Sequence, residues 1–315
     1  MKGLTDIPGI RVGHVSDFDA ITGCTAILCE AGAVGGVDIR GSASGTEETP
    51  TLSPLHVDPV AHGILLAGGS AFGLEAASGV RRYLERQGVG FDTGAAKVPI
   101  VPAAILYDLA IGKADVRPTA AMGEAAAAAA TADAVKEGSV GAGTGATVGK
   151  ILGMRQAMKS GVGTFTVTLP GEVMVSSLAV VNAFGDVRDP ATGKILAGAR
   201  QTPDGAAFAD TQERMKRGAA GGFAVRNTTL VVVATNARIT KVQATKLAQQ
   251  AGLGMARTIF PVNTMFDGDI VFALSLGDRQ ADVNVLGVAA AEAVAESIMR
   301  AVKLAKTLGG VPGLG

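Results

Sequence analysis

The chain has 315 residues with 28 basic and 28 acidic side chains, so its formal net charge is zero. This balance gives no indication of nucleic acid or an anionic membrane as a partner. Glycine is abundant (44 residues) but has no triplet period, which excludes collagen, and the 48% of hydrophobic residues predicts a sizeable core in one large domain or two ordinary ones.

The cysteines and the N-terminus indicate the compartment. Cys24 and Cys29 form neither a disulfide framework nor a CxxC metal pattern. The opening MKGLTDIPGIRVGH lacks the apolar region of a signal peptide, and no run of about 18 apolar residues indicates a membrane span. We therefore expect a reduced, cytoplasmic protein.

In the first half of the chain, short apolar runs alternate with glycine-rich turns and helical patterns. Residues 24–39 predict two short strands around a Gly turn, and 63–69 predicts a buried strand. Apolar side chains at helical spacing follow in 70–88. The run 98–108 holds two prolines and predicts an edge or a loop into a short strand, whereas the alanine-rich stretch 119–138 predicts a helix.

The second half begins with a predicted hairpin over 161–187 that turns at Pro170-Gly171. Residues 188–227 hold mainly charged residues, Gly and Ala, and predict a flexible linker or exposed loop, which in a compact protein is usually functional or disordered. Strands followed by helices in both halves indicate an α/β or α+β fold with layered sheets and helices. The remaining predicted elements are a strand at 229–235, a helix at 240–251, a strand at 269–276 and a helix at 281–306.

The stretch FAVRNTTLVVVATN places threonines where this segment becomes a buried strand. A hydroxyl is a weak nucleophile without an adjacent base. A threonine that becomes a chain N-terminus carries its own base, because the α-amine has a pKa of about 7.7–8.0. For Thr228 this requires a cut after Asn227, which the hydroxyl would make by attacking the preceding carbonyl. The alternative is that Thr228 simply begins a strand.

Three motifs together, NTTLVVVATN, FDGDIVFALS and GGSAFGL, resemble the self-processing N-terminal-nucleophile family of L-aminopeptidase/D-esterases. This family includes the β-peptidyl aminopeptidases and the nylon-oligomer hydrolases, and the resemblance covers nearly the whole chain. It implies a four-layer α/β/β/α sandwich, a single hydrolase domain over 1–315 and a homotetramer without metal or organic cofactor. It also implies self-cleavage into an α-chain of 1–227 and a β-chain of 228–315, with Thr228 as the nucleophile.

The resemblance assigns three site residues upstream of the cut. An oxyanion-stabilising asparagine matches Asn182, and an amide N–H can bind a tetrahedral oxyanion without adding charge. Lys150 matches a lysine near the nucleophile, whose charge would hold a neighbouring amine neutral or stabilise negative charge. Tyr107 matches a tyrosine near the oxyanion. A turn asparagine, a surface lysine and a core tyrosine are the structural alternatives.

Further candidates lie downstream of the cut and at the predicted pocket. Asp267 and Asp269 flank Gly268, and carboxylates two positions apart project to the same side of an extended segment, where like charges raise one pKa. They match an Asp-x-Asp of the nylon-oligomer branch that orients the N-terminal threonine; an Asp-Gly turn is the alternative. Gly69 and Ser70, in GGSAFGL, resemble a signature near the substrate pocket, where glycine lets a backbone approach closely.

Two positions bear on the branch of the family. The asparagine before the cut, Asn227, is similar to the residue at this position in the nylon-oligomer hydrolases, whereas the aminopeptidases more often have glycine there. The strand ends Ala234-Thr235-Asn236, whereas the family usually ends it with aspartate, so the role of this strand end stays open.

Other chemistries have weaker signals. GAGTGATVGK, residues 141–150, is similar to a phosphate loop, but the glycine spacing fails and Ile151 stands where serine or threonine belongs. His14, His56 and His62 have no metal-binding spacing, and neither HExxH nor GxSxG occurs.

We expect a self-cleaving amide hydrolase that acts on short peptides, amino-acid amides or ω-amino-acid oligomers. The alternatives are an uncleaved, inert ligand-binding or structural member of the family and a nucleotide-binding module at 141–150.

Overall fold

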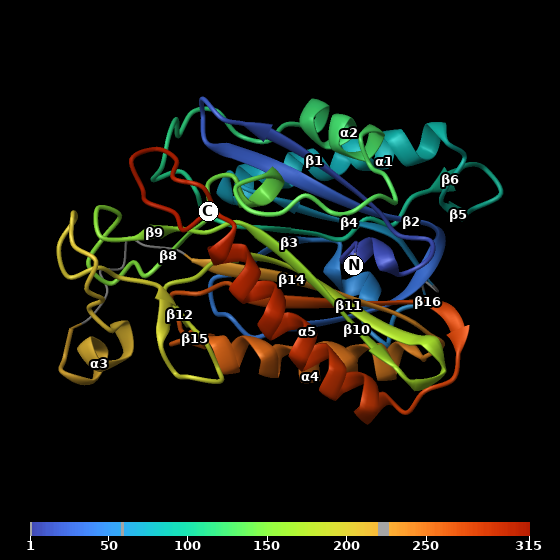
Figure 1. Ribbon diagram of the computed structural model, residues 1–315. Helices are drawn as coiled ribbons and strands as arrows, with labels where there is room; N and C mark the ends of the chain where they lie inside the picture. Colours follow the sequence, from blue (N-terminus) through green and yellow to red (C-terminus); the bar gives the residue numbers. More distant parts are fainter. Residues whose placement is uncertain (1, 58–59, 220–226) are drawn as a thin grey trace.

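The computed structural model describes residues 2–57, 60–219 and 227–315, which form two packed β-sheets with a pair of helices outside each (Figure 1). The helices are α1 (Ala76–Arg86), α2 (Ala120–Ala128), α3 (Thr211–Lys216), α4 (Lys241–Thr258) and α5 (Val283–Lys303). The strands are β1 (Arg11–Asp17), β2 (Thr22–Ile39), β3 (Gly45–Glu47), β4 (Ala61–Ala67), β5 (Phe91–Asp92), β6 (Lys97–Val98), β7 (Ala103–Ile105), β8 (Thr147–Val148), β9 (Met158–Lys159), β10 (Val162–Leu169), β11 (Val173–Asn182), β12 (Asp186–Arg188), β13 (Ile195–Ala197), β14 (Thr228–Ala237), β15 (Ile259–Phe260) and β16 (Ile270–Arg279).

One long strand joins the two sheets. β2 runs unbroken through 18 residues, which corrects the expected two short strands. Its pairing shifts between Leu28 and Ala33, where Gly32 has a φ of +87°, a left-handed conformation that favours glycine. The first half of β2 pairs with β1 and β4, and the second half pairs with β16. A glycine-rich bend therefore redirects the strand without ending it.

The central strands of the second sheet come from the C-terminal part of the chain. The order is β10-β11-β14-β16-β2, with β14 antiparallel to β11 and parallel to β16. Every residue of β14 is buried, as expected for a strand covered on both faces. The other sheet has β4 between β2 and β7, with β3 beyond β7. The run 98–108 was predicted to be an edge or a loop into a short strand. Its two prolines precede the short strand β7, which agrees with this prediction.

Three apolar clusters fill the three interfaces between layers. Leu230, Val232 and Phe272 pack between the two sheets. Their neighbours on the opposite face of β14, Val231 and Val233, pack with α4 and α5. The third cluster joins the outer face of β2 and β4 to α1 and α2, which lie above the strands in Figure 1, opposite α4 and α5. The two-residue alternation of strands thus produces the four-layer α/β/β/α sandwich.

The alanine-rich helix is shorter than predicted. It ends at Ala128, although helical propensity continues beyond it. Thr131 instead exchanges main-chain hydrogen bonds with Val12 of β1, at 3.0 and 3.2 Å. The tertiary pairing thus takes the backbone groups that another helical turn would use.

The segment after the β11 hairpin contains regular structure where a linker was expected. β13 pairs with β12, and α3 follows at Thr211. The buried carboxylate of Asp186 accepts hydrogen bonds from the amides of Ala199 (2.8 Å) and Thr211 (2.7 Å), which anchors both parts. The remainder of the predicted linker, 220–226, lies outside the described residues.

The other predicted elements agree with the structure. The hairpin β10–β11 turns at Pro170–Glu172, and the strands near 63–69, 229–235 and 269–276 and the helices near 240–251 and 281–306 are present. Among the described residues, no helix is both long and apolar enough to cross a membrane.

Candidate active site

The ladder between β11 and β14 ends with Asn182 opposite Thr228. Opposed residues of a ladder project to the same face. This face also carries Leu178 and Leu230 of the core between the sheets. Both polar side chains are therefore held at the end of the inter-sheet layer, where Asn182 is fully buried and Thr228 is 3% exposed.

The peptide link before Thr228 is held by the segment that precedes β16. Asn227 forms a parallel bridge with Asp267, and its N–H donates to the carbonyl of Phe266 at 3.0 Å. The N–H of Gly268 donates to the carbonyl oxygen of Asn227 at 2.7 Å. The hydroxyl of Thr228 donates to the same carbonyl oxygen at 2.6 Å. The hydroxyl and the link that would be cut are thus in contact.

The side-chain amide of Asn182 has a fixed orientation. Its Oδ1 accepts hydrogen bonds from Lys150 Nζ at 2.6 Å and from the N–H of Thr147 at 3.1 Å. Its Nδ2 donates to the main-chain carbonyl of Tyr107 at 3.0 Å. Tyr107 thus reaches the site through its backbone, where the resemblance suggested the tyrosine side chain. An amide N–H of Asn182 not used in this contact remains for an oxyanion.

Lys150 is buried, which corrects the alternative of a surface lysine. Its Nζ also donates to the main-chain carbonyl of Asn182 at 3.1 Å. Burial lowers the pKa of Lys150 from 10.5 to about 7; the carboxylate of Asp267 opposes this shift, and the charge of Lys159 adds to it. Burial therefore favours the neutral form of this amine more than in an exposed lysine.

The two aspartates hold different segments around Thr228. Asp269 accepts the N–H of Thr229 at 2.6 Å and that of Asn263 at 2.9 Å. Asp267 accepts the N–H of Phe184 at 3.2 Å, which ties it to the chain just beyond Asn182. Burial, and then the charge of Asp267, raises the pKa of Asp269 to about 7. Burial also raises the pKa of Asp267, so burial is the first cause for both aspartates and the repulsion between like charges adds to it at Asp269.

Gly69 and Ser70 form a turn that is hydrogen-bonded to the segment carrying Tyr107. Both have left-handed φ angles, +80° and +55°. The N–H of Gly69 donates to Asp108 at 2.7 Å, and the N–H of Ser70 donates to Leu106 at 2.9 Å. The turn is thereby fixed to the segment that carries Tyr107. Asp108 had not been singled out in the sequence.

Lys159 is a second buried lysine that the sequence gave no reason to select. It is fully buried, and its Nζ donates to the main-chain carbonyls of Thr144 (2.8 Å) and Ala146 (2.7 Å). It thus holds the turn whose next residue, Thr147, orients Asn182. A lysine among small residues, as in AMKSGVG, is the weak signal that was available.

The segment 141–150 does not form a phosphate loop. A short turn at Gly141–Gly143 leads into the two-residue strand β8, and no helix follows within this segment. A phosphate loop needs the N–H groups of a helix N-terminus, and Lys150 is engaged by Asn182. In the described part of the chain, no group of three His, Cys, Asp or Glu side chains lies close enough to hold a metal ion.

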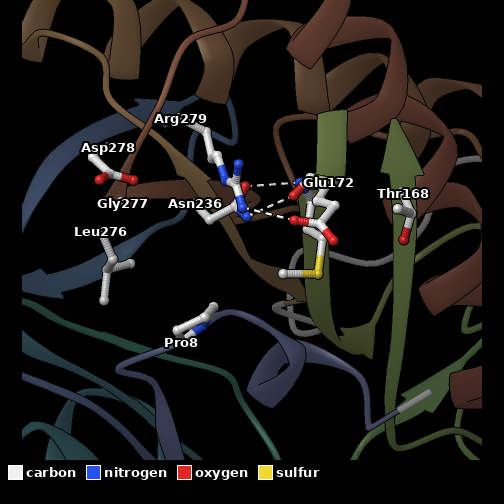
Figure 2. Close-up of a pocket in the computed structure, with 9 residues that line it drawn as sticks. Pro8, Thr168, Glu172, Asn236, Leu276, Gly277, Asp278 and Arg279 are labelled. Carbon is white, nitrogen blue, oxygen red and sulfur yellow. Dashed lines mark hydrogen bonds and ion pairs between the residues drawn. The ribbon is translucent and has the colours of Figure 1, made fainter. Parts of the chain in front are cut away.

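A cavity at the opposite end of β14 is separate from this site (Figure 2). It encloses about 520 Å³ and includes Asn236 in its lining. Asn236 donates to the carbonyl of Glu172 at 2.9 Å and accepts the N–H of Met174 at 2.8 Å. Asn236, which stands where the resemblance implies an aspartate, therefore fastens β14 to the β10–β11 turn.

The layered fold is similar to that of solved aminopeptidases, one of which is described as a variant of the N-terminal-nucleophile hydrolase fold. The L-aminopeptidase D-Ala-esterase/amidase of Ochrobactrum anthropi, described as a variant of that fold, superposes with a TM-score of 0.72 at 19% identity over 99% of this chain and 88% of its own. A beta-aminopeptidase of Burkholderia superposes with a TM-score of 0.70 at 24% identity, covering 100% of this chain and 91% of its own.

The chain belongs to peptidase family S58, whose pattern matches residues 2–314. An uncharacterized aminopeptidase of Mycobacterium tuberculosis is 40% identical, over 99% of this chain and 96% of the relative. A 6-aminohexanoate-oligomer endohydrolase of Kocuria is 31% identical, over 95% of this chain and 85% of the relative. Membership of this peptidase family makes the protein a hydrolase of amide bonds.

Proposed function

We propose that the chain cuts itself between Asn227 and Thr228 and then hydrolyses amides with Thr228 as an N-terminal nucleophile. The observation that supports this most directly is the 2.6 Å contact between the Thr228 hydroxyl and the carbonyl oxygen of Asn227. A strand-start threonine without such a role has no need of a buried lysine and two buried carboxylates nearby.

Maturation would proceed through an ester. Thr228 Oγ1 forms a bond to the carbonyl carbon of Asn227, the C–N bond breaks, and the Thr228 nitrogen takes a proton to become an amine. Water then hydrolyses the ester, which releases the Asn227 carboxylate and restores the hydroxyl. The products are an α-chain of 1–227 and a β-chain of 228–315.

In turnover, the new amine would act as the base for the Thr228 hydroxyl. The hydroxyl attacks the substrate carbonyl, and the side-chain amide of Asn182 stabilises the oxyanion. The tetrahedral intermediate expels the leaving amine, and water hydrolyses the acyl-enzyme. Lys150 and Asp267 would set the charge around the amine, while Asp269 holds the backbone that presents it.

The substrate class is proposed from the relatives. The more similar relative is named an aminopeptidase, which favours short peptides and amino-acid amides. The second candidate is a linear ω-amino-acid oligomer, favoured by the relative named for 6-aminohexanoate oligomers and by the Asp-Gly-Asp sequence at 267–269. We also propose a homotetramer, which the sequence resemblance implies; its mass in solution tests this.

The Thr228→Ala variant tests the proposal. We expect a single full-length band on a denaturing gel and no hydrolysis of amino-acid amides or 6-aminohexanoate oligomers, whereas the unsubstituted protein gives two bands and a free N-terminal threonine. Thr235→Ala is the matched control, since it removes another buried hydroxyl from β14, one that donates to Met174. A Thr228→Ala protein that still matures and turns over substrate would refute the assignment.

A further inference from the structure

We propose that the backbone N–H of Gly268 is the oxyanion donor for maturation, and that a different donor, the side chain of Asn182, serves turnover. This inference rests on the proposed self-cleavage. Gly268 donates to the carbonyl oxygen of Asn227 at 2.7 Å, the oxygen that becomes negative when Thr228 attacks. The amide of Asn182 donates instead to the carbonyl of Tyr107.

The Gly268 amide is fixed from both sides. The preceding carbonyl, that of Asp267, accepts the N–H of Ala43 at 2.9 Å. The following residue, Asp269, is tied through its carboxylate to the N–H of Thr229 at 2.6 Å. A donor held in place before reaction stabilises developing charge more than one that must reorient.

Glycine is required for this approach. A Cβ at position 268 would lie 2.8 Å from Thr228 Oγ1 and 2.7 Å from the carbonyl oxygen of Ala43. Any side chain there would displace the hydroxyl or the backbone that covers it. The glycine between the two aspartates therefore brings a main-chain donor and the attacking hydroxyl to one carbonyl.

The chemistry separates the two donors. As Thr228 Oγ1 bonds to the carbonyl carbon of Asn227, the carbonyl electron pair moves onto the oxygen that Gly268 already contacts. Breaking the C–N bond restores the carbonyl as an ester, and the Thr228 nitrogen leaves as the amine. Once water has released Asn227, this link no longer exists, and a substrate carbonyl takes its donor from Asn182 on the facing strand.

Replacing Gly268 by glycolic acid tests the proposal without adding a side chain. The replacement changes one N–H to an ester oxygen and is introduced by cell-free translation with a suppressor tRNA. Alkaline cleavage between 267 and 268 verifies incorporation. We expect fragment 228–315 to form about 100-fold more slowly than from the unsubstituted chain, the scale of a lost oxyanion donor.

Lactic acid in place of Ala43 is the matched control, because it removes a neighbouring N–H that contacts Asp267 rather than Asn227. We expect this chain to mature at the unsubstituted rate. A Gly268 ester that matures at that rate, or two esters that slow maturation equally, would overturn the inference. Failure of the unsubstituted chain to mature would instead refute the proposed function.

Discussion

Asn182 and Thr228 are partners at the last position of the β11–β14 ladder, with both side chains on the face between the sheets. A rigid ladder thereby sets the separation of the proposed nucleophile and its oxyanion donor. Because neither group sits on a long loop, we expect their relative position to be set before any substrate arrives.

The Asn182→Ala variant should separate turnover from maturation. We expect turnover to fall by about 100-fold or more, since an oxyanion donor is lost, while self-cleavage is largely kept. Initial rates on an amino-acid amide and the band pattern on a denaturing gel measure the two effects. Unchanged turnover would return Asn182 to a structural role.

Asn236→Ala is the control for Asn182→Ala, because Asn182 ends the β11–β14 ladder and Asn236, also buried, lies just beyond its other end. The side chain of Asn236 hydrogen-bonds to main-chain groups near the β10–β11 turn, the carbonyl of Glu172 and the N–H of Met174. We expect a loss of stability of about 1–3 kcal/mol without the selective loss of turnover.

Replacing Lys150 by methionine should change the pH dependence of hydrolysis. A nearby positive charge disfavours protonation of the Thr228 amine, so its removal raises the pKa of that amine. We expect the acidic limb of the kcat/KM profile to move up by about 1 pH unit. The exposed Lys113 gives the control, Lys113→Met, whose profile should match the unsubstituted enzyme. An unmoved acidic limb in Lys150→Met would show that its charge does not reach the amine.

Asp269→Asn should weaken the hydrogen bonds that hold the backbone around Thr228. Its two carboxylate oxygens each accept one N–H, from Thr229 and Asn263. An asparagine presents only one oxygen, so in either orientation its NH2 group faces a buried N–H. We expect a loss of about 1–3 kcal/mol in unfolding free energy and slower maturation.

The control for this variant is Asp92→Asn, which alters an exposed aspartate that accepts the N–H of Gly94. Its stability should change by less than about 0.5 kcal/mol. Urea unfolding in a Thr228→Ala background keeps the chain in one piece for both measurements. Equal stability of Asp269→Asn and its parent would contradict the described contacts.

Lys159→Met should reveal the buried amine through the pH dependence of stability. Burial lowers the pKa of Lys159 from 10.5 to about 7, so between these values the unfolded chain binds a proton that the folded chain does not. The free energy of unfolding of the chain with Lys159 should therefore fall relative to that of Lys159→Met as pH falls from about 10 to about 7, by at most about 1.4 kcal/mol per pH unit. A constant difference over this range would mean that Lys159 titrates normally.

Much of the candidate site could be predicted from side chains in short sequence motifs. Thr228 and the pair Asp267 and Asp269 were selected for their chemistry and for the resemblance, whereas Asn182 and Lys150 were assigned by the resemblance alone. The structure brings these residues together. Their roles stay predictions until the variants are measured.

The contributions that were missed have no signature in a sequence. The N–H of Gly268 and the carbonyl of Tyr107 are main-chain groups that every residue possesses. Lys159 looks like any surface lysine until the fold buries it.

Fold errors had a similar origin in long-range contacts. The helical propensity of alanine does not reveal that Thr131 pairs with Val12, which ends the helix early. The segment after residue 188 is poor in apolar residues, so its sequence does not reveal that Asp186 binds the N–H of Thr211 and orders it. Local patterns did predict β14, which is a short apolar run with every residue buried, and the long helix α5.

The course of β2 through both sheets bears on how the molecule comes apart. Its first half is hydrogen-bonded to β4 and its second half to β16, so peeling one sheet from the other would strain a continuous backbone. Heating should accordingly unfold the two sheets in one cooperative step. The backbone amides of Cys24 and Val37, one in each half of β2, should then show the same change in hydrogen-exchange rate when the protein is stabilised or destabilised.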